Sequence, residues 1–297
     1  MVRLGLLIIR VFGGIAWNEE NMTESTELPS ARPEQWRPSE FEERTPSVAR
    51  MYDFLLGGKD NLGVDRERAR EAVSADPLFP RVVRENRAFL GRVARFLAEE
   101  CGIDQFLDIG TGLPTQDNVH QIVQRINPDA SVVYVDNDPV VLAHGRALLA
   151  DNNRTTVIQA DLRDPGAILA HPDVRRLLDL DRPVALLLLA ILHFVPDEAE
   201  PHALLDELRA ALPSGSYLAI THGSPDLRPD VVHRLEEIYS RTASPALARS
   251  REDVARFFGD FEMVDPGLVW VPWWRPEQEP AEDSDLVWFL GGVARKP

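Results

Sequence analysis

Phe106-Leu-Asp-Ile-Gly-Thr-Gly112 is the stretch that decides the fold, because it is an apolar strand that runs into a turn with two glycines. Glycine lets the backbone take a positive φ and approach a ligand closely, and a helix after such a turn directs its amide groups at that ligand. Turns of this kind occur in many α/β proteins, so an ordinary tight turn is the alternative. The segments around the turn decide between the two interpretations.

Apolar runs of strand length alternate with helical patterns on both sides of this turn. The run 184–190, Val-Ala-Leu-Leu-Leu-Leu-Ala, is apolar on both faces, as a central parallel strand should be. The strand-like segments 267–271 and 285–293 have only a Pro/Glu-rich loop between them, which predicts an antiparallel hairpin. The sequence therefore predicts an α/β fold with a doubly wound, mostly parallel sheet. Strands are expected at 105–109, 131–135, 155–159, 184–190 and 217–221. Helices are expected at 47–56, 65–74, between Pro80 and Gly102, at 118–126, 139–150 and 197–212, and within 226–258. In the last of these segments, Ser250 and Asp253 have the spacing of a capping box.

The chain before the sheet divides by its patterning. Residues 22–44 carry almost no periodic apolar signal, which is typical of disorder. The apolar run in 1–17 is split by Arg10 and followed by no small-residue cleavage site, which disfavours an export signal, and we expect 1–21 to be dispensable. The predicted organisation is a disordered or non-native extension (1–45), a helical cap (46–102) and the sheet domain (103–297).

The composition limits the class of function. Of 297 residues, 44% are hydrophobic and 27% charged, and no apolar run approaches the ~20 residues of a membrane helix. A net charge of −16 argues against binding duplex nucleic acid, which needs a basic surface. The single cysteine, Cys101, excludes an internal disulfide and a thiolate metal cluster, and it fits a reducing cytoplasm. We expect a cytoplasmic protein without metal, nucleic-acid or membrane partners, and the oligomeric state stays open.

Acidic side chains close the next two strands. Asp136 ends the strand after the glycine turn, where a carboxylate can accept both hydroxyls of a ribose, and Asp138 fits a cap of the helix that begins at Pro139. Asp161 follows the third strand and could accept a hydrogen bond from an exocyclic amine such as that of adenine. The fourth strand leads to His193, which is either catalytic or a structural histidine. All these features lie at carboxyl ends of strands, where open α/β sheets bind ligands.

Two kinds of nucleotide site compete for this arrangement. A dinucleotide fingerprint needs Gly-x-Gly-x-x-Gly directly after the strand, but here Leu113-Pro-Thr115 follows Gly112 and the third glycine is absent. Asp108 also precedes the turn, where nicotinamide-binding strands usually keep an apolar residue. The Asp-x-Gly-x-Gly form resembles the first motif of class I S-adenosylmethionine-dependent methyltransferases, with Pro114 in place of that motif's third glycine.

An amino-terminal block narrows the resemblance. Ala49-Arg-Met-Tyr-Asp-Phe-Leu-Leu-Gly-Gly-Lys-Asp-Asn61 resembles the hallmark segment of an actinobacterial S-adenosyl methyltransferase family that was long catalogued as a domain of unknown function. The resemblance covers residues 46–297 and implies a Rossmann-like sheet of seven strands. It also implies S-adenosylmethionine as the cofactor and S-adenosylhomocysteine as the product. Further matching segments are 107–115, 118–120, 133–139, 161–165 and 192–197.

The resemblance implies a cofactor site residue by residue. The amino-terminal block either folds over the cofactor, with Lys59 meeting the methionine carboxylate, or is a packed helix that Gly57 and Gly58 stop. By portion of the cofactor, the implied contacts are Asp108, Gly110 and Gly112 for methionine, Asp136 for ribose, Asp161 for the adenine amine and Ala190 for the methionyl wall. The predicted cofactor-binding residues are, in full, Tyr52, Lys59, Asp108, Gly110, Thr111, Gly112, Asp136, Asn137, Asp161, Leu162 and Ala190.

Methyl transfer from a sulfonium is a displacement on an already activated carbon, so alignment and exclusion of water supply much of the rate. An oxygen or nitrogen acceptor can also need a base, for which His193, His222 and Tyr52 are candidates. We predict a methyltransferase acting on an unidentified small-molecule acceptor. The alternatives are a non-catalytic sensor of S-adenosylmethionine or its product, and a nicotinamide oxidoreductase, which the missing glycine disfavours. Four tryptophans either wall an acceptor pocket or form the core and rim of the hairpin: Trp270, Trp273, Trp274 and Trp288.

Overall fold

The structure is a computed structural model that describes residues 44–114, 117–148 and 152–297. By its internal contacts the chain divides at residues 37 and 38, and all described residues belong to the second unit. The expectations for residues 1–21 and for disorder before residue 44 therefore fall outside the described residues. The boundary expected between a cap and a sheet domain at residue 102 stays a prediction.

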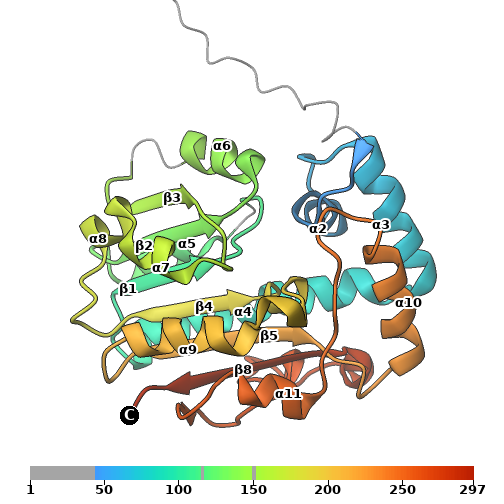
Figure 1. The fold of residues 1–297 in the computed structure, drawn as a ribbon. Coiled ribbons are helices and arrows are strands. Elements are labelled where there is room, and N and C mark those ends of the chain that lie inside the picture. The colour runs from blue at the N-terminus through green and yellow to red at the C-terminus, as the bar shows by residue number, and fades with distance from the viewer. Residues whose placement is uncertain (1–43, 115–116, 149–151) are drawn as a thin grey trace, which may run out of the picture. The chain divides into compact units, whose positions relative to one another are not determined.

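A twisted β-sheet forms the centre of the described unit (Figure 1). Its strands lie in the order β3-β2-β1-β4-β5-β8-β6, and β7 pairs with β8 beside that path. The first five strands pair in parallel, and β8 runs antiparallel to β5. Since the chain winds outward from β1 in one direction and then from β4 in the other, the switch point lies between β1 and β4. The strands are β1 (Gln105–Ile109), β2 (Ser131–Asp136), β3 (Thr155–Gln159), β4 (Ala185–Leu189), β5 (Tyr217–Gly223), β6 (Glu262–Met263), β7 (Val269–Trp270) and β8 (Phe289–Arg295).

The doubly wound, mostly parallel sheet with a terminal antiparallel hairpin is confirmed. The hairpin differs in detail, because two short strands, β6 and β7, pair with different parts of β8 where the sequence predicted one longer arm. Each of the seven predicted strands is present, with β7 inside the predicted 267–271, and β6 is an eighth strand that the sequence did not predict.

The helix expected within 226–258 is two helices, α10 (Pro229–Tyr239) and α11 (Arg251–Arg256). The prediction was wrong for the residues between them, which are irregular. There the Thr242 hydroxyl donates to the Ser244 carbonyl at 2.9 Å, and Pro245 has no amide to donate. The predicted cap of α11 is confirmed, since Ser250 Oγ accepts from the Asp253 amide at 3.1 Å.

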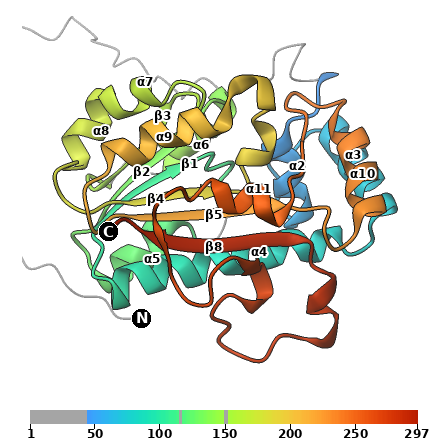
Figure 2. The same cartoon turned by 60° about the horizontal axis from the view of Figure 1, so that its bottom comes forward.

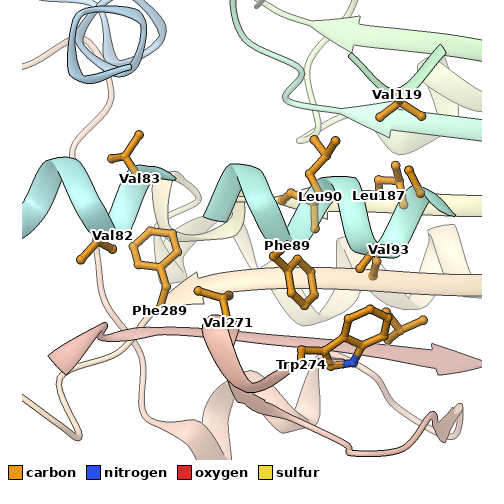
Figure 3. Close-up of a cluster of buried hydrophobic side chains, with 14 of the residues drawn as sticks. Val82, Val83, Phe89, Leu90, Val93, Val119, Leu187, Val271, Trp274 and Phe289 are labelled. Carbon is orange, nitrogen blue, oxygen red and sulfur yellow. The ribbon is translucent and has the colours of Figure 1, made fainter. Parts of the chain in front are cut away.

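Helices cover both faces of the sheet (Figure 2). Along β1, Phe106 points to the face covered by α4 (Phe79–Arg95) and α5 (Val119–Ile126), and Leu107 points to the opposite face. On the α4 face, Phe89 packs edge-on against Trp274 with ring centroids 5.2 Å apart (Figure 3). Alternation of side chains along buried strands produces these two apolar layers. The opposite face is covered by α7 (Pro165–Ala170), α8 (Pro172–Leu177), α9 (Pro201–Ala211) and α11.

The amino-terminal helices lie at the edge where the parallel strands end. In Figure 1 the arrowheads of β3 and β4 point toward α2 (Val48–Leu55) and α3 (Gly63–Ala75). A buried carboxylate fixes the entry to α2: Asp65 accepts from the Ser47 amide at 2.9 Å and from Arg50 Nε at 2.7 Å. These bonds join the start of α2 to α3. Across the described residues, no helix has the length and hydropathy that a membrane span requires.

Candidate active site

A cavity of about 900 Å³ opens at the carboxyl ends of the parallel strands. Its floor is made by the turns that follow β1, β2, β3 and β4, and its roof by residues 45–53 and 243–245. The Ala243 amide donates to the Pro46 carbonyl at 3.0 Å, which joins the two roof segments. Ligand pockets span about 300–1,000 Å³, so this cavity is large enough for a nucleotide-sized molecule.

The glycine turn after β1 forms the centre of the floor. Gly110 and Gly112 have φ values of +78° and +66°, which favour glycine. A Cβ atom on Gly110 would lie 2.5 Å from Cγ1 of Ile191, so the turn and the segment after β4 pack at the distance that glycine permits. The Gly112 amide donates to Asp136 Oδ2 at 2.8 Å. The turn is thus held in a fixed shape by both neighbouring strands.

The two acids after β2 divide their roles as the sequence suggested. Asp136 faces the cavity, and Asp138 caps α6 (Pro139–Leu148) by accepting from the Val140 amide at 2.8 Å. Asp138 also accepts from Ser47 Oγ at 3.2 Å, which ties the roof to the floor. Burial raises the pKa of Asp136 to about 6, although it accepts from the amides of Gly112 and Asp138. Carboxylates kept from water in this way interact strongly with ligand donors.

Asp108 is the most deeply buried acid of the floor, with 5% of its surface exposed. Burial raises the pKa of Asp108 to about 7, and the positive charge of Arg87 opposes that rise. Thr111 Oγ1 lies 3.5 Å from Asp108 Oδ2, which is the limit of a hydrogen bond. The carboxylate form of such a buried group is stabilised by a nearby cation or by several hydrogen-bond donors.

The floor after β3 carries a permanently ionised acid. Arg163 holds Asp161 through its Nε and its amide, both 2.9 Å from Oδ1, and it lowers the pKa of Asp161 to about 2. Asn137 Nδ2 donates to Asp161 Oδ2 at 3.2 Å, and Leu162 supplies apolar lining beside them. Arg163 Nη2 also donates to Oδ2, so both oxygens of Asp161 already accept two donors each. At the end of the cavity over β3, the lining therefore consists of this paired acid and the apolar wall of Leu162.

Ala190, directly after β4, has a φ of +58°, which is a strained value for a residue with a Cβ atom. Its amide donates to Thr221 Oγ1 at 2.8 Å and to the Thr221 carbonyl at 3.3 Å. Thr221 lies in β5 and is completely buried. We did not foresee Thr221 from the sequence, where a threonine in a buried strand was the only signal.

The amino-terminal block reaches the cavity through Tyr52, whose hydroxyl donates to the Val83 carbonyl at 3.2 Å. The structure does not bring Lys59 to the other predicted residues, since Lys59 is exposed and outside the lining. Asp53 holds that turn by accepting from Asn61 Nδ2 at 2.7 Å, and a Cβ atom on Gly58 would overlap its carboxylate. Gly57 and Gly58 therefore form a tight turn against Asp53.

The structure places both candidate histidines outside the cavity lining. His193 is 7% exposed and packs against Phe289, with ring centroids 5.5 Å apart. Burial lowers the pKa of His193 well below its ordinary value and that of His222 to about 3. In His222, Nδ1 lies 2.7 Å from the Gly223 carbonyl and Nε2 lies 3.3 Å from Arg249 Nη1. Both rings are neutral parts of the core.

The tryptophans of the terminal hairpin also lie outside the cavity lining. Trp274 and Trp288 are buried, and Trp288 Nε1 donates to Asp76 Oδ2 at 3.0 Å. These two belong to the core, which was the alternative that the sequence left open. Trp273 is exposed and Trp270 half-buried.

Helix α4 contributes lining residues that we did not predict, namely Asn86, Arg87 and Leu90. Asn86 stands among apolar residues at helical spacing, on a face that the sequence marks as buried. A polar amide in such a position needs a partner, and this signal was available before the structure.

Comparisons with known proteins agree with this geometry. The sequence model of one family, described as S-adenosyl methyltransferase, matches residues 34–297. The chain is similar to a candidate methyltransferase from Thermobifida fusca YX, whose crystal structure is 44% identical and superposes with a TM-score of 0.83 over 88% of this chain and 99% of that one. It is also similar to a DUF574 family protein from Streptomyces avermitilis MA-4680, with 41% identity and a TM-score of 0.83 over 86% of this chain and 100% of that one. No curated protein matches significantly.

Proposed function

Because this chain belongs to the S-adenosyl methyltransferase family and is an S-adenosylmethionine-dependent methyltransferase, we propose that its 900 Å³ cavity holds the cofactor. One observation carries the proposal. All the residues that the sequence predicted to bind the cofactor, except Lys59, line this single cavity. They come from four different strand ends and from α2, so their convergence does not follow from proximity in the sequence.

The position of each strand end suggests how the cofactor lies. Asp136 has one lone pair on each carboxylate oxygen beyond the amides it already accepts, and these can receive the two ribose hydroxyls. Leu162 lies beside the adenine edge, whose amine replaces Asn137 Nδ2 as a donor to Asp161 Oδ2, and Asp108 takes the methionine end. In this pose the sulfonium methyl lies near Ala190, because β4 pairs with β1 on the side away from β2 and β3.

We propose a small acceptor molecule with an apolar body. Beyond Ala190 the lining is uncharged and mostly apolar, with Phe194, Val195, Pro196 and Pro245. Among the described residues of the lining there is no histidine, lysine or cysteine. The acceptor therefore brings a nucleophile that needs no strong base, and the enzyme aligns it with the methyl group and excludes water.

Catalysis is favoured over a purely sensing role because the family is one of methyltransferases. We place the enzyme in the cytoplasm, since its single cysteine suits a reducing compartment. The net charge of −16 favours a small acceptor over nucleic acid.

Calorimetric titration with S-adenosylhomocysteine and with NADH tests the cavity assignment. We expect the first to bind and the second not to bind. Transfer of a tritiated methyl group to a panel of apolar phenols, thiols and amines then tests the acceptor class. Phe194→Ala should raise the KM of any acceptor found without changing the affinity for S-adenosylhomocysteine. Transfer to nucleic acid or protein alone would contradict the proposed acceptor.

A further inference from the structure

One buried polar atom in the lining has no partner in the structure. Asn86 is 4% exposed, and its Nδ2 donates to the hydroxyl oxygen of Tyr52 at 2.9 Å. That hydroxyl gives its own proton to the Val83 carbonyl, so it can only accept from Asn86. The orientation of the amide is thereby fixed, and Oδ1 of Asn86 is left without a donor. A buried acceptor of this kind costs about 1–3 kcal/mol unless a donor reaches it, and because Asn86 lines the cavity, a ligand there can supply that donor.

Arg87, the next residue on α4, adds a positive charge beside Asn86. Arg87 also lines the cavity, and its Nη2 donates to the Asp117 carbonyl at 3.1 Å and to Asn118 Oδ1 at 3.0 Å. Its positive charge lowers the pKa of both Asp108 and Tyr52 against the effect of burial, so it lies within electrostatic reach of both. The helix side of the cavity therefore presents a cation and an unsatisfied acceptor, opposite the buried carboxyl group of Asp108.

We propose that Asn86 and Arg87 of α4 complete, with Asp108, a subsite for the amino-acid end of S-adenosylmethionine; this rests on the proposed cofactor cavity. The α-ammonium group has three donors, which Asp108 and Asn86 Oδ1 receive. The α-carboxylate pairs with the Arg87 guanidinium, whose planar fork matches carboxylate geometry. This assignment gives Arg87 the role that the sequence suggested for Lys59. It also means that α4, which is not part of the glycine-turn motif, helps to select which adenosine compounds bind.

The test compares two ligands that differ only in this end. S-adenosylhomocysteine carries the amino acid, and 5′-methylthioadenosine keeps the adenosine and the thioether without it. We expect Arg87→Met to weaken S-adenosylhomocysteine roughly tenfold to a hundredfold and to leave 5′-methylthioadenosine within about twofold. Asn86→Leu should weaken S-adenosylhomocysteine roughly five- to tenfold with the same selectivity.

Three further variants test the roles of these side chains. Arg84→Met removes an exposed arginine of the same helix outside the cavity lining and should change neither affinity. Tyr52→Phe removes the hydroxyl that orients the Asn86 amide, so it should weaken S-adenosylhomocysteine about as much as Asn86→Leu and less than Arg87→Met. Arg87→Lys keeps the charge and should recover part of the loss.

The outcomes separate this subsite from the cavity assignment. If wild-type protein binds both ligands and the α4 variants weaken both equally, or weaken neither, the subsite is wrong and the cavity assignment stands. If wild-type protein binds both ligands equally tightly, the amino-acid end contributes nothing and the subsite is again wrong. If wild-type protein binds neither ligand, the cavity assignment fails and the subsite fails with it.

Discussion

The amide of Gly112 donates a 2.8 Å hydrogen bond to Oδ2 of Asp136, which joins the glycine turn after β1 to the acid that ends β2. These two residues are 24 positions apart; Gly112 follows β1, and Asp136 ends the adjacent strand β2. The bond aligns the carboxylate along the floor of the cavity and holds the turn open at the same time. A change at Asp136 therefore affects both the ribose contact and the shape of the turn.

We expect Asp136→Ala to weaken binding of S-adenosylhomocysteine by about 1–3 kcal/mol, because ribose hydroxyls and the Gly112 amide lose their acceptor. Calorimetry measures the loss. Asp164→Ala is the control, since Asp164 caps α7 by accepting from the Ala167 amide at 3.0 Å and lies outside the cavity lining. It should cost about 1 kcal/mol of stability and leave the affinity unchanged. An unchanged dissociation constant in folded Asp136→Ala protein would show that Asp136 only shapes the turn.

Gly110→Ala should destabilise the protein by about 2–5 kcal/mol in urea unfolding. A left-handed backbone at a residue with a Cβ atom costs about 1–2 kcal/mol, and a contact of 2.5 Å with Ile191 Cγ1 adds overpacking of about 1–3 kcal/mol. Gly112→Ala separates the two causes, since a Cβ atom there meets nothing within 4 Å and only the strain remains. Equal losses for both variants would show that packing against Ile191 contributes nothing.

The sheet could be predicted because each strand has a local signature: an apolar run, an acid or a glycine after it, and a helix in between. The cavity lining was predictable where a residue directly follows a strand. Residues 240–249 were mispredicted because their shape depends on distant partners. Ala243 bonds to Pro46, and Arg249 donates to the carbonyls of Leu192 and Val195. No local pattern encodes such contacts.

The roles of Lys59 and Asn86 could not be predicted from local sequence patterns either. Composition drew attention to Lys59, but its direction depends on how Asp53 packs beneath Gly58. Asn86 looked like one position of an apolar stripe, and its role depends on where α4 crosses the strand ends. Residue types at strand ends can be read from the sequence, whereas helix crossings need the packed structure.

The acids of the floor make cofactor affinity depend on pH. Asp108 and Asp136 have pKa values raised to about 7 and about 6 in the empty protein, and both are needed as carboxylates to accept from the ligand. Binding therefore releases protons, and the dissociation constant of S-adenosylhomocysteine should increase as the pH falls from 8 to 5. Titrations in buffers of different ionisation enthalpy measure the protons released. In Asp108→Asn protein the dependence above pH 6 should disappear, and its persistence would assign it to another group.

The same shifts predict how the empty protein's stability changes with pH. A carboxyl group whose pKa is raised on folding stabilises the folded state most below its unfolded pKa, near 4, and that contribution is lost as the pH rises through its folded pKa. The contribution of Asp108 should therefore fall between about pH 4 and pH 7. Urea unfolding of wild-type and Asp108→Asn protein across this range isolates this contribution. As the pH rises, the free energy of unfolding of the wild type should fall relative to that of the variant. A difference that stays constant with pH would contradict the raised pKa.

The strained residue at the reactive end of the cavity should depend on one buried hydroxyl. Thr221 Oγ1 accepts from the Ala190 amide at 2.8 Å, and Ala190 holds a φ of +58°. Thr221→Val keeps the shape but removes this acceptor, so we expect a loss of about 1–2 kcal/mol in stability and a weaker affinity for S-adenosylhomocysteine. Ala190→Gly relieves about 1 kcal/mol of backbone strain, and in the double variant it should restore part of the loss. Thr156→Val on β3, outside the cavity lining, is the matched control and should change the affinity little. If Ala190→Gly lowers the stability of both the wild type and the Thr221 variant, Ala190 is unstrained, and its hydrogen bond to Thr221 Oγ1 does not hold a strained turn.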